Sequence, residues 1–168
     1  MTTRELQGSA FQHPSSPDSS ITVASSMAWV PLDSVAEKWA DFGAQARLAP
    51  AFVATGVAFL ALSWEASALR HYSLAQQAHW HDPVLRWLGE TVQDLNEALQ
   101  HWSRVVLWLE RLANHEQQDP EVRPLFTHVM EQQQRLWMLA QQVQAEQMTC
   151  EQDHGKVDAV TVVMGVQR

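Results

Sequence analysis

The feature that most constrains this chain is one long apolar stripe in residues 83–113. Its hydrophobic side chains recur at alternating spacings of three and four residues: Leu85, Leu88, Val92, Leu95, Leu99, Trp102, Val106, Leu109 and Ala113. Such spacing places them on one side of an α-helix. About thirty residues of helix span roughly 45 Å. Because a long helix with one apolar side needs other elements to cover that side, the stripe predicts an all-α fold.

Two Asp-Pro pairs, at residues 82–83 and 119–120, mark helix starts. The aspartate can cap the unpaired amides of a first helical turn, and a proline there gives up no needed hydrogen-bond donor. Residues 114–118 lack the apolar stripe. We therefore expect helices over 83–115 and 120–149, joined by a short loop as an αα-hairpin.

This hairpin predicts one specific contact. Residues 102 and 132 lie equally far from residue 117, the middle of the turn, so Trp102 should lie opposite Gln132, with Gln133 beside it. A buried indole N–H needs an acceptor, which a glutamine amide oxygen can supply. We expect Trp102 to pack against one of these two glutamines.

Two further helices are expected before the hairpin. Ser34 and Glu37 match a capping box, which predicts a helix over 34–48. A mainly apolar segment follows and predicts a second helix over 50–80. The four helices indicate an up-and-down bundle or elongated αα-hairpins, which form one domain of residues 31–150.

Residues 48–64 carry no charge and permit two interpretations. A transmembrane helix needs ~20 mainly apolar residues, and about 17 is the lower limit. Pro50 near one end and Glu65 at the other count against a span, so a buried bundle helix is the first interpretation. Its main stripe would comprise Val53, Val57, Leu60 and Trp64, with an alanine stripe beside it. The alternative is a single-span, membrane-associated protein anchored by this segment.

The two ends of the chain lack the helical pattern. Residues 1–30 are rich in Ser, Thr and Pro, which predicts a disordered tail. Residues 151–168 form a C-terminal tail, and the β-branched residues within 156–168 predict a short strand. One strand cannot satisfy its own backbone hydrogen bonds, so it would need a partner strand. The alternative is a disordered or loosely packed terminus.

Composition narrows the function classes. The net charge is −8, with only two lysines and with scattered arginines, so a cationic surface for nucleic acid is not expected. The single cysteine, Cys150, cannot form an intrachain disulfide, which is typical of a reducing compartment. We expect a cytoplasmic protein, with membrane association as the alternative. The eight tryptophans suit a packed core first and partner interfaces second.

No catalytic motif is evident. Cys150 neighbours Glu151, whose negative charge raises rather than lowers a thiol pKa, so a cysteine nucleophile is not expected. His79 and His81 lie two residues apart, without a second group of metal ligands nearby in the sequence. Glu-x-x-His occurs once, ending at His154, whereas a di-iron bundle needs two copies. We therefore expect no enzyme activity, no cofactor, and no catalytic, cofactor-binding or metal-binding residues.

One aromatic group lies beside the main stripe of the long helix. Its members are Trp87, Trp108, Leu107 and His101. Aromatic surface left outside a helical seam marks protein association when neighbouring helices do not cover it. We therefore expect a non-enzymatic assembly subunit or adaptor that binds a protein partner or itself through these four residues. Nothing in the sequence identifies a small-molecule ligand.

Overall fold

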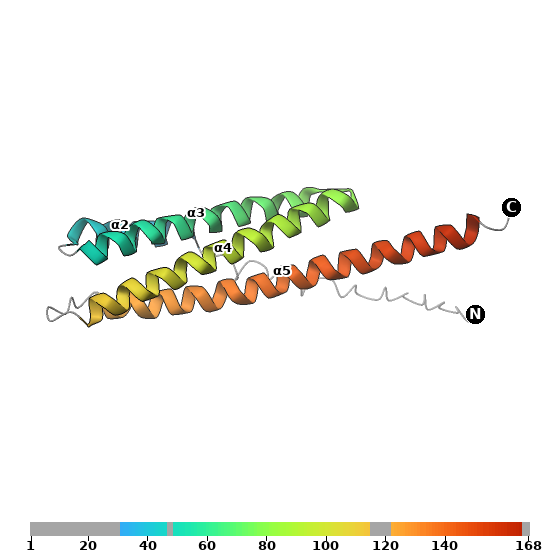
Figure 1. The fold of residues 1–168 in the computed structure, drawn as a ribbon. Coiled ribbons are helices and arrows are strands. Elements are labelled where there is room, and N and C mark those ends of the chain that lie inside the picture. Colours follow the sequence, from blue (N-terminus) through green and yellow to red (C-terminus); the bar gives the residue numbers. More distant parts are fainter. Residues whose placement is uncertain (1–30, 47–48, 115–121, 166–168) are drawn as a thin grey trace, which may run out of the picture.

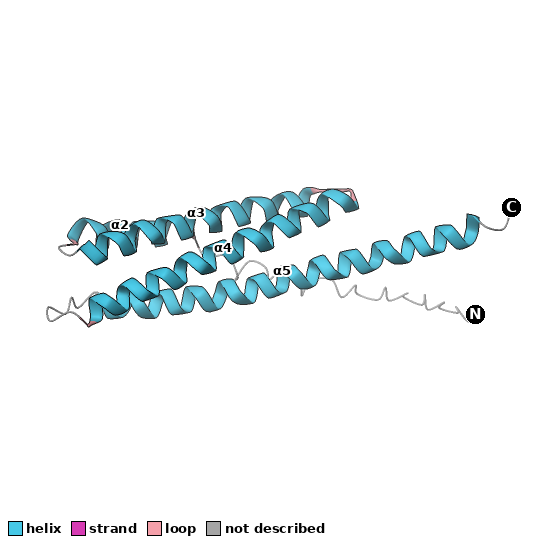
Figure 2. Ribbon diagram, viewed as in Figure 1, coloured by secondary structure: helices cyan, strands magenta, loops and turns pink. Residues whose placement is uncertain are grey.

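The computed structural model describes residues 31–46, 49–114 and 122–165, with side chains to residue 156. In this part of the chain every element is a helix: α2 (Leu32–Gln45), α3 (Ala49–Gln77), α4 (His81–Ala113) and α5 (Val122–Gly165). Consecutive helices run in opposite directions, and α4 packs against both α3 and α5 (Figure 1). Figure 2 shows the same arrangement coloured by secondary structure. The predicted all-α, up-and-down bundle is confirmed.

The apolar stripe predicted in the long helix forms the centre of the core. Leu88, Leu95, Trp102 and Leu109 of α4 are buried, while Val92, Leu99 and Val106 are half-buried. The buried face also includes Ala98, Val105 and Leu112. It is wider than a coiled-coil seam, as a helix in contact with two others requires.

The face that α3 turns to the core differs from the prediction. Its buried residues are mainly small: Ala51, Ala54, Ala58, Ala61, Ala68 and Ala75, together with Leu62 and Glu65. Val53 and Leu60, two members of the predicted main stripe, are exposed. Alanines allow the backbones of α3 and α4 to approach closely, and the large side chains of α4 then fill the space between them. The predicted main stripe is therefore wrong for Val53 and Leu60, whereas Val57 and Trp64 are half-buried against the core. The alanine stripe predicted beside it is buried.

Both predicted helix caps are wrong in detail. α2 begins two residues before Ser34, whose hydroxyl donates to the Pro31 carbonyl oxygen at 2.9 Å instead of accepting an amide hydrogen. α4 begins at His81, one residue before the predicted cap Asp82, and its N-cap residue Trp80 makes no side-chain cap hydrogen bond. The start signals therefore locate these helices to within two residues without identifying the caps.

α5 is longer than expected. The predicted end near residue 149 is wrong, since α5 continues through Gly165. The short strand predicted within 156–168 is not confirmed, because the described part of that segment is helical. β-branched residues disfavour a helix by only tenths of a kcal/mol each, and a helix pairs its backbone groups without needing a partner strand. The tail predicted over residues 1–30 lies outside the described residues.

Candidate functional site

A buried carboxylate links three helices. Glu65 on α3 is only 2 % exposed. Its Oε1 accepts the indole N–H of Trp102 on α4 at 2.5 Å, and its Oε2 accepts an N–H from Gln132 Nε2 on α5 at 2.7 Å. Trp102 and Gln132 are buried as well. Glu65 is therefore a shared polar contact for α3, α4 and α5 within a mainly apolar core.

The surroundings of Glu65 favour its protonated form. Burial raises the pKa of this carboxyl from 4.5 to about 7, because desolvation penalises the charge more than the hydrogen bonds from Trp102 and Gln132 stabilise it. The buried Gln132 Oε1 has no hydrogen-bond partner among the described residues. If the Gln132 amide turns over, this oxygen can accept from a Glu65 O–H. Each charge state of Glu65 thus has a suitable hydrogen-bonding arrangement.

The predicted neighbours Trp102 and Gln132 meet through a third residue. Both donate to Glu65, so the expected hydrogen bond from the indole to a glutamine oxygen is wrong. The next residues along each helix also meet, since Gln133 Nε2 donates to Ser103 Oγ at 2.9 Å. This contact agrees to within two residues with the predicted register of the α4–α5 hairpin, which places residue 103 opposite residue 131. The sequence pattern of the hairpin did not reveal the acceptor, because α3 supplies it and a carboxylate accepts more strongly than an amide.

The four residues of the predicted α4 interface have different surroundings. Trp87 and Trp108 are half-buried, and each has the guanidinium of a neighbouring arginine 4.4 Å from its ring centroid. His101 is half-buried, and its Nδ1 donates to the backbone carbonyl oxygen four residues earlier at 2.8 Å. Leu107 is 57 % exposed. Of the four side chains, only Leu107 is freely presented to solvent.

A second apolar surface lies on α3, opposite the alanines that face the core. We call it the α3 outer face and define it by Phe52, Val53, Phe59 and Leu60, all of which are exposed. Phe52 and Leu60 expose 57 % and 52 % of their surface. Sequence reasoning missed this surface because it assigned the larger residues of α3 to the core. The sequence feature that could have indicated this surface is the uncharged segment 48–64, which contains all four residues.

A histidine–carboxylate pair joins α3 to α4. His71 Nδ1 lies 2.8 Å from Asp94 Oδ2, and Asp94 is buried. The His71 ring also stacks on Trp87, with the ring centroids 5.3 Å apart. In the part of the chain that the structure describes, no hydroxyl or thiol is hydrogen-bonded to His71. The pair therefore holds Trp87 and the two helices in place, but it lacks the nucleophile of a catalytic triad.

Three metal-ligand side chains meet where α4 begins beside α5. One ligand atom from each of His81, Asp82 and His154 lies within 4.8 Å of the other two. The two imidazole rings stack with their centroids 4.0 Å apart. Sequence reasoning missed this cluster because it sought ligands within single segments. The predicted α4–α5 hairpin could have revealed it. Residues 81 and 153 lie equally far from residue 117, the middle of the turn, so they are expected to lie opposite each other.

Cys150 lies next to this cluster. Burial, followed by the nearby charges of Asp153 and Glu151, raises the pKa of its thiol. The raised pKa is in the direction predicted from the sequence. A raised thiol pKa leaves less of the reactive thiolate at neutral pH, so Cys150 is poorly suited to nucleophilic chemistry.

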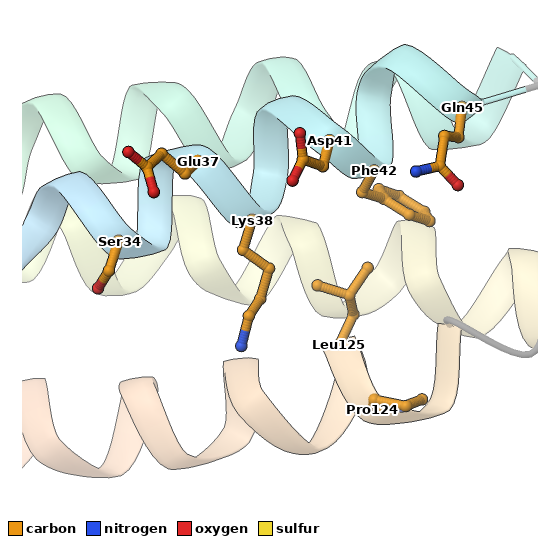
Figure 3. A pocket seen from close by; sticks show the side chains of 8 residues that line it. All are labelled: Ser34, Glu37, Lys38, Asp41, Phe42, Gln45, Pro124 and Leu125. Atoms are coloured by element: carbon orange, nitrogen blue, oxygen red, sulfur yellow. The ribbon is translucent and has the colours of Figure 1, made fainter.

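A groove separates α2 from the start of α5 (Figure 3). It is lined by Ser34, Glu37, Lys38, Asp41, Phe42, Gln45, Pro124 and Leu125. In Figure 3 the Lys38 side chain extends from α2 towards α5. No histidine or cysteine lines the groove, and the Ser34 hydroxyl donates to a backbone carbonyl oxygen. The groove therefore lacks an activated nucleophile.

Comparisons of the chain with protein-family models, curated proteins and solved structures find no match. Function is therefore inferred from the surfaces and side-chain clusters of this chain alone.

Proposed function

We propose that this protein is a non-enzymatic assembly subunit or adaptor, and that it binds a second copy of itself through the α3 outer face. The observation that supports this proposal is the exposure of Phe52, Val53, Phe59 and Leu60 on one side of one helix, within ~2.5 helical turns. Burying a fully exposed Phe or Leu side chain contributes ~1.5–3 kcal/mol, so covering the roughly half-exposed Phe52 or Leu60 contributes about half of that. Contiguous exposed apolar groups of this kind mark association surfaces.

The charge distribution suits a second copy as the partner. The chain carries a net charge of −8, so two copies repel each other where charged surfaces meet. Residues 48–64 carry no charge, and the α3 outer face lies within them. Two copies related by a two-fold axis could therefore bring these faces together without opposing like charges.

The exposed apolar side chains of α4 and α5 form less suitable surfaces. On α4 only Leu107 of the predicted interface is exposed, since Trp87 and Trp108 are half-buried beside arginines. On α5 the exposed members are Met130, Trp137, Met138 and Met148. They extend over about five helical turns and alternate with glutamines, so they form no compact apolar group. The α4 group remains the second candidate interface.

One pair of substitutions distinguishes the α3 outer face from the α4 interface. Phe59→Glu places a charge on the α3 outer face, and Leu107→Glu places the same charge at an exposed position on α4. Light scattering should give a dimer mass for the wild type and for Leu107→Glu, and a monomer mass for Phe59→Glu. Circular dichroism should show the same helix content for all three proteins. A monomeric Leu107→Glu beside a dimeric Phe59→Glu would transfer the interface to α4 and contradict the proposal.

A membrane-associated protein is the alternative function. By length and composition alone α3 could cross a membrane, although 33 % of its most apolar 18-residue window is buried against the rest of the protein. A span would also separate Glu65 from the donors Trp102 and Gln132. Retention of the full-length protein in the membrane pellet after a carbonate wash would favour this alternative. Recovery in the soluble fraction without detergent would favour the bundle.

A further inference from the structure

His81, Asp82 and His154 form a cluster that neither the proposed association nor core packing explains. His81 and Asp82 are the first two residues of α4, and His154 lies on α5. His81 is half-buried, whereas the other two side chains are exposed. Each residue contributes one ligand atom, and the three atoms lie within 4.8 Å of one another. The cluster thus combines two imidazole nitrogens with one carboxylate oxygen, contributed by two helices.

The hydrogen bond of His81 determines which ring nitrogen can bind a cation. His81 Nε2 lies 2.8 Å from the carbonyl oxygen of Cys150. A carbonyl oxygen only accepts, so Nε2 carries the hydrogen, and the lone pair of the neutral ring is on Nδ1. Metal-binding histidines commonly donate their second N–H to a backbone carbonyl in this way, which fixes the ring and its tautomer. His81 therefore already has the hydrogen bond expected of a metal ligand.

The surroundings of His81 Nδ1 point to a cation. This atom is buried and has no hydrogen-bond partner among the described residues. Asp82 Oδ1 lies 3.6 Å from it. Two electron-pair donors that face each other are stabilised by a cation between them, whereas a buried acceptor without a partner costs roughly 1–3 kcal/mol.

We propose that His81, Asp82 and His154 bind a divalent cation of the zinc class, and that this cation ties the start of α4 to α5. Imidazole nitrogens with a carboxylate oxygen suit Zn²⁺, and three protein ligands leave a fourth position for water. Two ligand atoms of a tetrahedral zinc lie ~3.4 Å apart. The distances in the cluster must therefore shorten by about 1.4 Å at most. A bound metal also lies in the plane of each imidazole ring, so His154 must turn out of its stack on His81. Rotamer changes of the exposed Asp82 and His154 side chains can supply both movements.

The place of the cluster defines what the cation would do. α5 continues beyond the α3–α4 turn (Figure 1), and residues 151–156 are exposed. His154 lies within this exposed segment, while His81 and Asp82 belong to the body of the bundle. A shared cation would therefore hold the extending part of α5 against the bundle.

Calorimetric titration of Zn²⁺ into the full-length protein tests the binding. One Zn²⁺ should bind per chain, and His154→Ala and Asp82→Asn should each weaken the affinity at least tenfold. His79→Ala is the matched control, since His79 is exposed two residues from His81 but lies outside the cluster. Its affinity should equal that of the wild type. Absence of binding, or the same affinity in His154→Ala as in the wild type, would overturn the proposal.

Proteolysis after lysine tests the link between α4 and α5. The chain has only two lysines, Lys38 on α2 and Lys156 two residues after His154. Zn²⁺ should slow cleavage after Lys156 relative to cleavage after Lys38, which serves as the internal control for any effect on the protease. This protection should be lost in His154→Ala. A ratio of the two cleavage rates that Zn²⁺ leaves unchanged in the wild type would contradict the proposed tie.

Discussion

Glu65→Gln is expected to stabilise the protein above neutral pH. Burial raises the pKa of Glu65 from 4.5 to about 7, which corresponds to about 3 kcal/mol of unfolding free energy at ~1.36 kcal/mol per pH unit. Glutamine has almost the shape of glutamate and carries no charge to desolvate. Its Oε1 can accept from Trp102, and once the Gln132 amide turns over its Nε2 can donate to Gln132 Oε1.

The pH dependence of this effect has a defined sign. The pKa of Glu65 is higher in the folded state than in the unfolded state, so the folded state binds the proton more tightly. The stability that protonated Glu65 contributes is fully present below about pH 4.5 and is lost as the pH rises through about 7. Other ionisable groups also contribute to the pH dependence of stability. The relevant quantity is therefore the stability of Glu65→Gln minus that of the wild type at each pH, which should grow by about 3 kcal/mol up to about pH 8.

Urea unfolding followed by tryptophan fluorescence at a series of pH values measures this difference. Glu110→Gln is the matched control, because it removes an exposed carboxylate from α4. The unfolding free energy of Glu110→Gln should stay within ~0.5 kcal/mol of the wild-type value at every pH. A stability difference for Glu65→Gln that does not change with pH, or that falls as the pH rises, would refute the reasoning.

Two further predictions concern helix contacts. Gly43→Ala should destabilise the protein by ~1–3 kcal/mol, because its Cβ would lie 2.7 Å from Thr55 Cγ2. Gly89→Ala in α4 should stabilise it by ~0.5–1 kcal/mol, because the added carbon would meet only Gln147 Nε2, at 3.7 Å. Thermal unfolding should show Tm shifts of opposite sign, and shifts of the same sign would contradict this assignment. Trp102→Phe removes one donor to Glu65 and should cost roughly 1.5–3 kcal/mol in urea unfolding. The cost should be larger above pH 7, where the carboxylate is ionised, than near pH 5, and equal costs would count against the hydrogen bond.

The periodic elements were predictable from the sequence. The spacing of Leu88, Leu95, Trp102 and Leu109 predicted α4 and its buried face, because helical geometry alone determines which residues share a side. The short connection after α4 predicted the hairpin, and the contact between Ser103 and Gln133 agrees with its predicted register to within two residues. These predictions required only local spacing and a turn position.

The contacts between elements were less predictable. Which side of α3 faces the core depends on the size of the α4 residues that it meets, so hydrophobicity alone assigned Val53 and Leu60 wrongly. The role of Glu65 was missed because its two donors lie 37 and 67 residues away in the sequence. The cluster of His81 and His154 likewise depends on how two helices pack together. The local sequence pattern of either helix does not indicate this contact.

The mass of the wild-type protein in detergent-free solution, measured by light scattering at high and at low protein concentration, tests association through the α3 outer face most directly. The proposed self-association predicts a mass near twice the chain mass of 19.0 kDa at high concentration, falling towards the chain mass on dilution. A mass of 19.0 kDa at every concentration would contradict it.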